Sequence, residues 1–284
     1  MNNTVLEASI PSPSINSFHV GGLTIHFYAL CILVGIFLCL KLTAYRWKSW
    51  GQDPERIWDI ALWSFPFGIV GARAYHVLIT DPASYFGAGV DPLNVFKIWE
   101  GGIGIMGAIS LGSLGAWIAC RRYGISFALF ADAVAPGILL AQACGRWGNW
   151  FNQELFGKPT TLPWGLEISS HSPNFPHQYP AGTLFHPTFL YESLWNLCGV
   201  MLLLYLGRKS VLVLGQTFWL YVLYYGVGRI IIEIFWRIDT PHYVLGLRVH
   251  VWTAGLLIVL GLCGLIIAKM RARQRALIDA AQGV

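Results

Sequence analysis

Long apolar runs recur along nearly the whole chain and are separated by short polar stretches. An α-helix needs about 20 apolar residues to cross a hydrocarbon core of ~30 Å. Seven windows meet this need: about 22–44, 57–79, 101–120, 126–145, 187–206, 212–235 and 250–269. The pattern therefore predicts an all-α integral membrane protein, a bundle of about seven transmembrane helices that forms a single polytopic domain over residues 1–284.

Positive charges predict how these helices are oriented. The lysines and arginines gather in alternate connections: Lys41, Arg46, Lys48 and Arg56; Arg121 and Arg122; Arg208 and Lys209; and a basic tail at about 269–284. Loops rich in Lys and Arg stay in the cytoplasm. The C-terminus is therefore expected in the cytoplasm and, with an odd number of spans, the N-terminus outside. A Pro-rich loop at about 158–185 is then also outside.

Composition supports the membrane class and argues against several others. The chain is 55% hydrophobic and 12% charged, with a mean hydropathy of +0.55, whereas soluble domains carry roughly 25% charged residues. The net charge of +5 is scattered over helix ends without a basic stripe, so no nucleic-acid partner is expected. The six cysteines lack CxxC spacing and suit apolar packing. No metal-ligand motif such as HExxH is present, and neither a metal nor a cofactor is expected.

Two glycine patterns in the third window need separate interpretation. Gly104, Ala108, Gly112 and Ala116 recur every four residues, which predicts a small-residue face where another helix packs closely. The segment 102–107 also fits GxGxxG, but no βαβ pattern surrounds it, so a dinucleotide site is not expected.

Ionisable groups inside spans are costly unless they are paired, so each is a candidate functional residue. At the outer end of the fourth window, Arg146 offers planar, bidentate donors that suit a phosphate. Asn149 and Asn152 add neutral donors, and Glu154 can hold the arginine. The pattern predicts a headgroup site, and the alternative is a helix end capped by amides with a snorkelling arginine.

A second group opens the fifth window. His186 precedes a proline, which favours the first helical turn. Thr188, Glu192 and Asn196 are four residues apart and share one helix face, which is too polar to face lipid. The face is expected to border a polar cavity, with polar packing between helices as the alternative.

A third group lies near the outer end of the sixth window, where Tyr225, Arg229, Glu233 and Arg237 also recur every four residues. Arg229 and Glu233 can pair at i,i+4, and Arg237 supplies a second cation. Two arginines on one face suit a dianion, whereas the alternative is a purely structural ion pair.

Three further polar residues stand alone: His26 and Tyr28 in the first window and Asp132 in the fourth. An isolated acid such as Asp132 is more typical of a structural residue than of a catalyst.

The segment from Gly145 to Gly157, GRWGNWFNQELFG, resembles the signature GRxGNxxNxExxG of prolipoprotein diacylglyceryl transferases. The similarity extends in order over nearly the whole chain, through His26-Phe-Tyr28, Gly71-Ala-Arg73-Ala-Tyr75, Glu100-Gly-Gly-Ile-Gly104, His186-Pro-Thr-Phe-Leu-Tyr-Glu192 and Gly228-Arg229 followed by Glu233.

The resemblance implies a reaction and a location. Such an enzyme lies in the bacterial plasma (inner) membrane as a multi-pass protein, with its active site toward the outer face. It transfers the diacylglyceryl group of phosphatidylglycerol to the lipobox cysteine in the signal peptide region of a prolipoprotein, forming a thioether and releasing glycerol-1-phosphate. This is the first step of bacterial lipoprotein maturation.

The resemblance also implies roles for individual residues. Those that resemble lipid-site residues are Arg146, Asn149, Asn152, Glu154 and Gly157, while Arg229 resembles an essential arginine, and Tyr28, Glu192, Glu233 and Arg237 resemble supporting polar residues. In the reaction, Arg146 and Arg229 would stabilise the charge on the departing phosphate.

The chain departs from the family pattern at two places. Many relatives have a histidine where this chain has Met106, and a methionine cannot act as a base. The candidates for the base are therefore His186 and Glu192, with Tyr28 behind them because a phenol has a pKa near 10. One extra residue also separates Glu233 from Arg237, which weakens the match of that arginine.

Other classes of membrane protein could use the same residues. Buried arginines around a phosphate site would also serve a transporter for anionic lipids or metabolites, although no internal repeat is evident. A scaffold protein would leave the polar residues in register unexplained. An intramembrane protease is disfavoured because GxSxG, HExxH and an aspartate pair are lacking.

Overall fold

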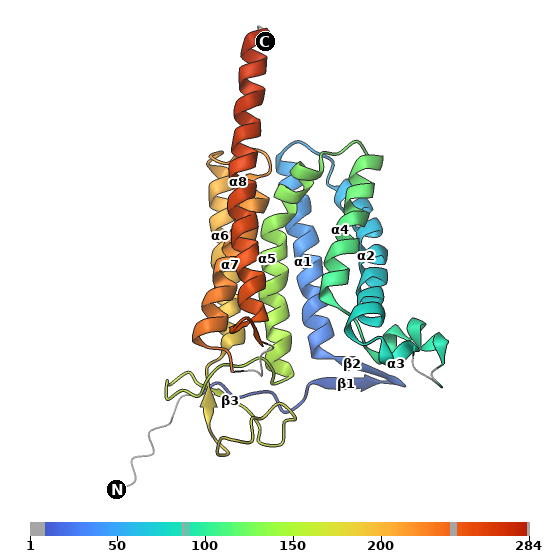
Figure 1. Ribbon diagram of the computed structural model, residues 1–284, viewed down its shortest axis with the longest axis vertical. Helices are drawn as coiled ribbons and strands as arrows, with labels where there is room; N and C mark the ends of the chain where they lie inside the picture. The colour runs from blue at the N-terminus through green and yellow to red at the C-terminus, as the bar shows by residue number, and fades with distance from the viewer. Residues whose placement is uncertain (1–8, 87–88, 90, 239–242, 283–284) are drawn as a thin grey trace. The chain divides into compact units, whose positions relative to one another are not determined.

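The structure, a computed structural model, describes residues 9–86, 89, 91–238 and 243–282. Its helices are α1 Phe27–Ser49, α2 Glu55–Tyr75, α3 Ala83–Phe86, α4 Ile105–Arg122, α5 Phe127–Phe151, α6 Thr188–Arg208, α7 Gln216–Phe235 and α8 Val249–Gln282 (Figure 1). The shorter helical turns are η1 His76–Thr80, η2 Pro92–Phe96 and η3 Ile98–Glu100. Three antiparallel hairpins pair β1 Ser17–Val20 with β2 Leu23–His26, β3 Leu166–Glu167 with β4 Leu184–Phe185, and β5 Tyr243–Val244 with β6 Leu247–Arg248.

Every predicted apolar window falls on a helix, but the helices differ in how well they suit a membrane. Five are long and apolar enough to cross one, namely α1, α5, α6, α7 and the part of α8 over Val249–Asp279. The helices of the other two windows, α2 and α4, do not meet the same criterion of length and apolar composition. The protein is thus a mostly helical, multi-pass membrane protein, and the number of seven spans stays a prediction.

The beginning of the first span was predicted wrongly. The window began at about residue 22, whereas α1 begins at Phe27 and His26 is the last residue of strand β2. The hairpin forms because Gly21, with φ of 60°, turns the chain between two strands, and Thr24 and Ile25 are β-branched. His26 therefore pairs with Ser17 in the hairpin and does not belong to the helix.

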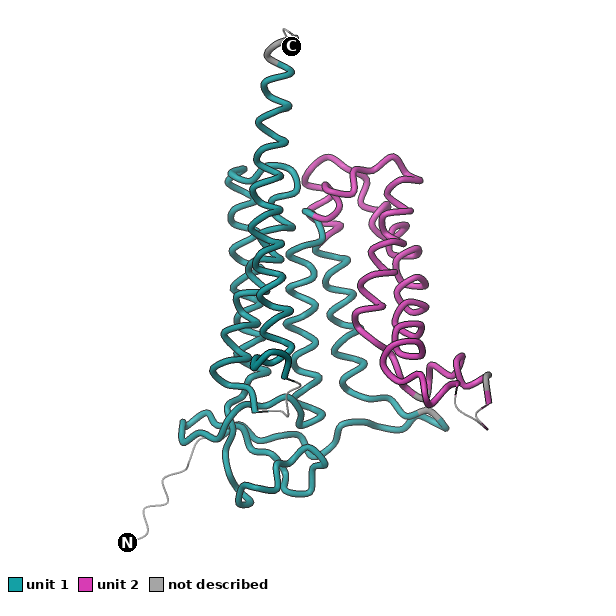
Figure 2. Tube along the Cα trace, in the orientation of Figure 1, with its two compact units in different colours: residues 1–42, 132–284 teal, residues 43–131 magenta. Residues whose placement is uncertain are grey.

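The chain forms two compact units, one of residues 1–42 and 132–284 and the other of residues 43–131 (Figure 2). The single polytopic domain over residues 1–284 stays a prediction.

In the unit of residues 43–131, helices α2 and α4 pack glycine against glycine. A methyl group on Gly71 would overlap the carbonyl oxygen of Gly107, and one on Gly107 would overlap the carbonyl oxygen of Gly71. The Ser64 hydroxyl donates to the carbonyl oxygen of Gly112 at 2.9 Å, and Gly112 itself lies against Gly68. The small-residue face therefore packs against a helix as predicted, although its closest approach is at Gly107.

In the other unit, α5, α6 and α7 share an apolar core. Ala135 and Leu139 of α5 are fully buried with Val200 and Leu203 of α6, and α7 packs against them. Asp132 accepts hydrogen bonds from the backbone N–H groups of Gly215 at 2.6 Å and Phe218 at 2.9 Å, at the beginning of α7. This acid caps a helix N-terminus inside the unit, as expected for a structural residue.

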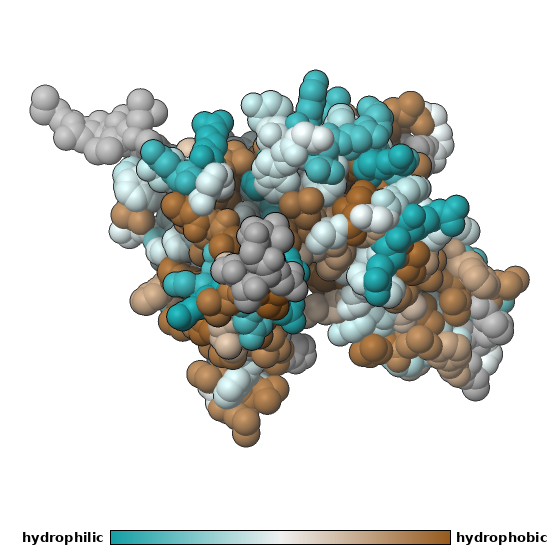
Figure 3. Space-filling model, turned by 90° about the horizontal axis from the view of Figure 1, so that it is seen from above, coloured by the Kyte–Doolittle hydropathy of each residue, from teal (hydrophilic) through white to brown (hydrophobic). Residues whose placement is uncertain are grey.

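Helix α8 extends beyond its neighbours α6 and α7 at its C-terminal end (Figure 1). Over its first part it exposes a row of large apolar side chains: Leu256, Val259, Leu260, Leu262, Ile266 and Ile267. Its last turns expose Lys269, Arg271, Arg273 and Arg275. Figure 3, which looks onto this end, shows hydrophilic residues at helix ends and hydrophobic residues along the flanks. An apolar flank with a basic end suits a helix that leaves a bilayer.

The segment after α5 is folded around an apolar core of its own. Its buried residues are Phe156, Leu166, Ile168, Phe175, Phe185 and Phe189, of which Phe189 belongs to α6. The predicted Pro-rich loop at 158–185 contains both β3 and β4. This core fixes the loop over the ends of α5 and α6, where the predicted site residues lie.

Candidate functional site

The signature segment forms the last turns of α5 and a tight turn behind them. Leu155 and Gln153 adopt left-handed backbone conformations, with φ of 57° and 51°, which bring the chain back toward the helix end. Glu154 therefore reaches its own helix, where its carboxylate accepts from the amides of Asn149 at 2.8 Å and Asn152 at 3.2 Å. The Asn149 amide oxygen in turn accepts from Arg146 at 3.3 Å. The motif spacing thus makes a closed hydrogen-bonded turn around one arginine.

Glu192 links this arginine to a second helix. Its Oε2 atom lies 2.7 Å from Nη2 of Arg146 and 3.9 Å from Nη1 of Arg229. These three side chains come from α5, α6 and α7 and are 18%, 9% and 13% exposed for Arg146, Glu192 and Arg229. Thr188 and Asn196 on the same face of α6 are buried too, so the predicted polar face turns inward.

A second carboxylate, Glu233, collects further arginines. Its oxygens lie 3.2 Å from Nη2 of Arg229, 3.0 Å from Nη1 of Arg248 and 3.9 Å from Nε of Arg237. Arg237 also donates through Nη1 to the carbonyl oxygen of Leu155 at 2.7 Å, which joins the network to the signature turn. The side chains of Glu233 and Arg237 are only 1% and 2% exposed.

We call the connected set of Arg146, Glu154, Glu192, Arg229, Glu233, Arg237 and Arg248 the arginine network. Among the described residues, it places four guanidinium groups around three carboxylates. Arg146 and Arg229 meet at one carboxylate, that of Glu192, so two guanidinium groups lie within reach of a single bound group. The network is therefore suited to an anion with phosphate geometry, which bidentate guanidinium groups bind well.

A narrow crevice reaches the network between α6 and α7. Glu192, Asn196 and Arg229 line it together with Trp195, Tyr225, Gly228 and Ile232. Gly228 leaves no room for a side chain, because a methyl group there would overlap the Trp195 ring. Tyr225 from the predicted row thus borders the crevice.

Arg248 is a member of the network that the sequence patterns did not predict. It ends strand β6, directly before α8, and its side chain is 18% exposed. In the sequence it is a single arginine before a long apolar run, which is also how an ordinary interfacial arginine occurs. Only the folded chain brings it to Glu233.

Gly157 and His186 lie together at the edge of the signature turn. The backbone N–H of Gly157 donates to the carbonyl oxygen of His186 at 2.9 Å, and a methyl group on Gly157 would lie 2.7 Å from Cβ of His186. Gly157 also forms a β-bridge with Arg237. A side chain at position 157 would therefore push the histidine segment away from the network.

The His186 ring has an environment of its own. Its Nδ1 atom lies 3.1 Å from the Tyr191 hydroxyl, which also accepts from Trp164 Nε1 at 3.1 Å. Burial, and to a smaller extent the nearby Lys158, lower the pKa of His186 below its ordinary value of 6.5. Among the contacts of the described residues, none joins its ring to the arginine network. His186 is thus a neutral histidine beside the network at neutral pH.

Tyr28 lies in the first turn of α1 and faces the signature helix. A methyl group on Gly148 would come within 3.1 Å of Cα of Tyr28, so the two helices approach closely between Arg146 and Asn149. The structure thus brings Tyr28 beside the predicted headgroup residues.

The segment before Met106 lies in the other unit. Arg73 fixes it by donating to the carbonyl oxygens of Gly101 at 2.8 Å and Gly102 at 2.9 Å, and also to those of Asn94 and Val95. Met106, in the first turn of α4, is 49% exposed. Arg73, which belongs to the segment Gly71 to Tyr75 that resembles the family, therefore has a structural role.

These features define a class, a multi-pass membrane protein with a buried, arginine-rich network at the ends of its helices. Comparison with known proteins gives the family: the family model of prolipoprotein diacylglyceryl transferase matches residues 16–267. The chain belongs to the prolipoprotein diacylglyceryl transferase family and is a transferase.

Curated relatives agree over most of the chain. The phosphatidylglycerol–prolipoprotein diacylglyceryl transferase of Bifidobacterium adolescentis is 48% identical over 95% of this chain and 83% of its own length. The protein of the same name numbered 2 in Streptomyces coelicolor is 50% identical over 93% of this chain and 82% of its own length. The phosphatidylglycerol–prolipoprotein diacylglyceryl transferase of Paenarthrobacter aurescens is 50% identical over 93% of this chain and 85% of its own length.

Proposed function

We propose that this protein transfers the diacylglyceryl group of phosphatidylglycerol to the cysteine thiol of a prolipoprotein lipobox. The thiolate sulfur attacks the glyceryl carbon that carries the phosphate ester. A carbon–sulfur bond forms while the carbon–oxygen bond breaks, and glycerol-1-phosphate leaves with the electron pair. The family supports the reaction, and the arginine network is the observation that supports its site.

The clustered guanidinium groups of the network suit this substrate. The phosphodiester of phosphatidylglycerol carries one negative charge, and the departing phosphate monoester carries more. Arg146 and Arg229 meet at Glu192, so a phosphate between them would gain two cations at once. Because charge on the phosphate grows as the bond breaks, these arginines stabilise the transition state more than the bound lipid.

The carboxylates of the site act by holding the arginines. Glu192 is engaged by Arg146 and Arg229, and Glu233 by Arg229, Arg237 and Arg248. A carboxylate held in this way positions its partners. Asn149 and Asn152 similarly keep Glu154 in place through their amide N–H groups. The amide oxygen of Asn149 accepts from Arg146, whereas that of Asn152 is assigned to the glycerol headgroup.

The thiol needs a proton acceptor, because at its reference pKa of about 8.5 only a few per cent is ionised at neutral pH. We assign this role to His186, whose ring is neutral at neutral pH because its pKa is lowered. When Nδ1 donates to the Tyr191 hydroxyl, Nε2 carries the free lone pair that can take the thiol proton. Tyr28 then lines the site beside Gly148 without taking the proton.

The proposed topology follows the positive charges. Seven spans, an outer N-terminus and a cytoplasmic basic tail place the signature turn and the segment 158–185 on the outer side of the bacterial plasma membrane. The prolipoprotein and the lipid then meet at the outer ends of α5, α6 and α7.

The experiment uses purified protein with phosphatidylglycerol and a lipobox peptide, and detects the modified cysteine by mass spectrometry. We expect product with the unchanged protein, and a loss of roughly 100- to 1000-fold in rate for Arg146→Ala and Arg229→Ala, as when donors to a developing charge are removed. Arg275→Ala, a change of an exposed arginine near the end of α8, is the matched control and should keep full activity.

The folding of each variant is checked by its melting temperature in the same detergent. If the folded, lipid-supplied protein gives no product, the proposed transferase activity is wrong and a transporter becomes the better hypothesis. If Arg146→Ala and Arg229→Ala keep full activity, the site assignment is wrong.

A further inference from the structure

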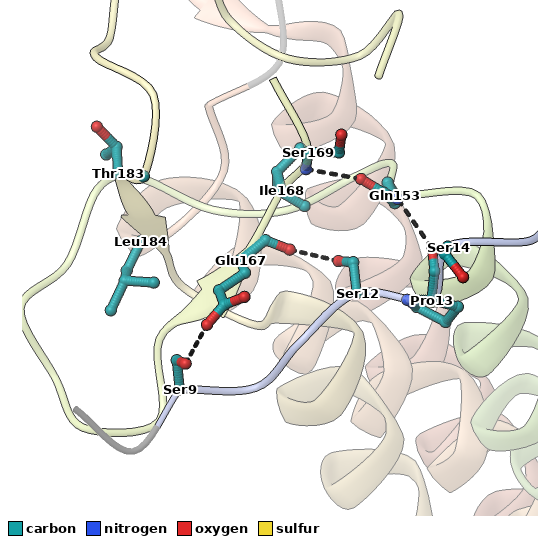
Figure 4. A pocket seen from close by; sticks show the side chains of 11 residues that line it. Ser9, Ser12, Pro13, Ser14, Gln153, Glu167, Ile168, Ser169, Thr183 and Leu184 are labelled. Atoms are coloured by element: carbon teal, nitrogen blue, oxygen red, sulfur yellow. Dashed lines mark hydrogen bonds between the residues drawn. The ribbon is translucent and has the colours of Figure 1, made fainter. Parts of the chain in front are cut away.

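A polar pocket of about 520 Å³ lies beside the signature turn and takes no part in the chemistry described so far. Three segments of one compact unit build it: the N-terminal segment 9–14, the segment 167–169 of β3 and beyond, and the segment 182–184 that enters β4. Gln153 of the signature turn completes the lining. Figure 4 shows Glu167 between the strand that carries Leu184 and the segment that carries Ser9 and Ser12.

Hydrogen bonds hold these walls together. The hydroxyl groups of Ser9 and Ser12 donate to the carboxylate and the carbonyl oxygen of Glu167 (Figure 4). The Gln153 side chain donates to the carbonyl oxygen of Pro13 at 3.0 Å and accepts from the backbone N–H of Ser169 at 2.9 Å. The pocket is therefore preformed, and one amide of the signature segment ties two of its walls together.

The pocket is suited to recognition by side chains. Strand β3 already pairs with β4 on one side and with Ile10 on the other, so it cannot accept an added strand. Pro11 and Pro13 have no backbone N–H to offer. What remains are hydroxyl groups, an amide and the Glu167 carboxylate, which can accept hydrogen bonds from peptide N–H groups and attract a cationic side chain.

Its charge excludes the lipid headgroup as the occupant. None of the described lining residues is basic, and Glu167 is the acidic one. An anionic phosphate would therefore be repelled, and an acyl chain would leave the polar wall groups without partners. A polypeptide with neutral or basic residues fits this lining better.

The pocket adjoins the arginine network through the chain itself. Gln153 follows Asn152 and precedes Glu154, and consecutive Cα atoms are about 3.8 Å apart. A polypeptide whose cysteine lies at the network could reach the pocket with two to four extended residues, each covering about 3.4 Å. These linking residues would lie on the side of the site from which the rest of the acceptor protein extends.

We propose that this pocket binds the extended segment that directly follows the acceptor cysteine, and that Glu167 favours basic over acidic side chains there. The proposal rests on the proposed transferase function. It makes the pocket a specificity site for the polypeptide, separate from the site for the lipid.

Photocrosslinking tests the location without requiring the reaction. A lipobox peptide has its cysteine replaced by serine and a benzoylphenylalanine at the second, third or fourth position after it. We expect crosslinks to the segments 9–14, 167–169 and 182–184, mapped by mass spectrometry. Crosslinks that occur only elsewhere would overturn the proposal.

Peptide charge tests the role of Glu167. Peptides with Lys or Asp at the crosslinked position are compared by kcat/KM. We expect the Lys peptide to be favoured by about two- to fivefold, as for an exposed ion pair, with no preference in Glu167→Gln and a reversed preference in Glu167→Lys. The KM for phosphatidylglycerol should stay unchanged. Glu167→Gln keeps the acceptor for Ser9, and Glu55→Gln is the control for charge at another exposed site.

The outcomes separate this proposal from the one on which it rests. If no peptide is modified by any protein, the transferase function fails. If peptides are modified but the Lys preference is absent, or persists in both Glu167 variants, the function stands and the pocket proposal is wrong.

Discussion

At the scale of single residues, two buried carboxylates hold the four arginines of the site in position. Glu192 joins Arg146 to Arg229, and Glu233 joins Arg229 to Arg237 and Arg248. Because an unpaired buried charge is costly, each arginine depends on its carboxylate as much as the carboxylate depends on it. Changes within the network should therefore affect lipid binding even where the residue does not touch the reacting carbon.

Arg248 allows a test of this dependence. Arg248→Ala removes one of the cations around Glu233, so Glu233 should draw more strongly on Arg229 and weaken its hold on phosphate. We expect the KM for phosphatidylglycerol to rise about tenfold, within the range for a lost charge-assisted hydrogen bond, with a smaller change in kcat. Steady-state kinetics with varied lipid measures this.

Arg248→Lys serves as the matched control because it keeps the charge but loses the planar donors. Its KM for phosphatidylglycerol should therefore lie between that of the unchanged protein and that of Arg248→Ala. An unchanged KM in a folded Arg248→Ala variant would show that Arg248 only holds the hairpin to α8.

His186 gives a prediction about pH. A base must be unprotonated to work, so activity should fall as the pH drops through the pKa of His186. Because burial and Lys158 lower that pKa below 6.5, the midpoint of the fall in activity should lie below pH 6.5. His186→Gln should be slower at every pH and lack this acid limb of kcat/KM.

Two controls accompany that experiment: the titration of the peptide thiol, measured separately, and the folding of the variant. If His186→Gln shows the same acid limb as the unchanged protein, the titrating group is another residue and the role given to His186 is wrong.

At the scale of elements, close helix packing depends on glycines that the four-residue pattern only partly revealed. The pattern predicted a small-residue face on α4, and that face does pack against α2. The closest contact, however, joins Gly71 to Gly107, which lies outside the pattern of Gly104, Ala108, Gly112 and Ala116. Where two backbones touch depends on the crossing angle and rotation of both helices, and one sequence pattern does not contain these.

Gly71→Ala tests this contact. Its methyl group would overlap the carbonyl oxygen of Gly107, so the helices must separate at a cost of roughly 1–3 kcal/mol. The melting temperature in detergent should fall accordingly. Gly255→Ala on α8 is the matched control, because no atom lies within 4 Å of the added group, and a helical Ala is favoured over Gly by up to about 1 kcal/mol. Equal melting temperatures for both variants would contradict the packing described.

At the scale of the whole molecule, exposed apolar side chains and the distribution of charge indicate a bilayer. Helices α1 and α8 expose many large apolar residues, which a soluble protein would bury. Basic residues lie at the end of α6 and in the C-terminal part of α8. Together they support the predicted orientation, in which these ends are cytoplasmic.

Cysteine labelling checks this orientation. The native cysteines all lie on helices α1, α4, α5, α6 and α8, so a membrane-impermeant thiol reagent should leave them unlabelled in intact cells. Ser170→Cys, in the segment after β3, should be labelled from outside, whereas Ser210→Cys, after α6, should be labelled only when the membrane is opened. The reverse pattern would overturn the topology.

The sequence by itself determined the membrane class, the approximate helices, the family signature and most members of the arginine network. These follow from local properties, because apolar length, helical spacing and motif order are all written along the chain. The pairing of Arg229 with Glu233 is one such case, since four residues separate them on one helix.

Only the tertiary structure decided which distant residues meet. It brought Arg146 to Glu192, Arg248 to Glu233 and the N-terminal serines to Glu167, and it began α1 after a hairpin that includes His26. Such contacts depend on how helices and loops cross in space. An isolated arginine before an apolar run or a serine near the N-terminus carries no local sign of its partner, so the sequence could not reveal these pairs.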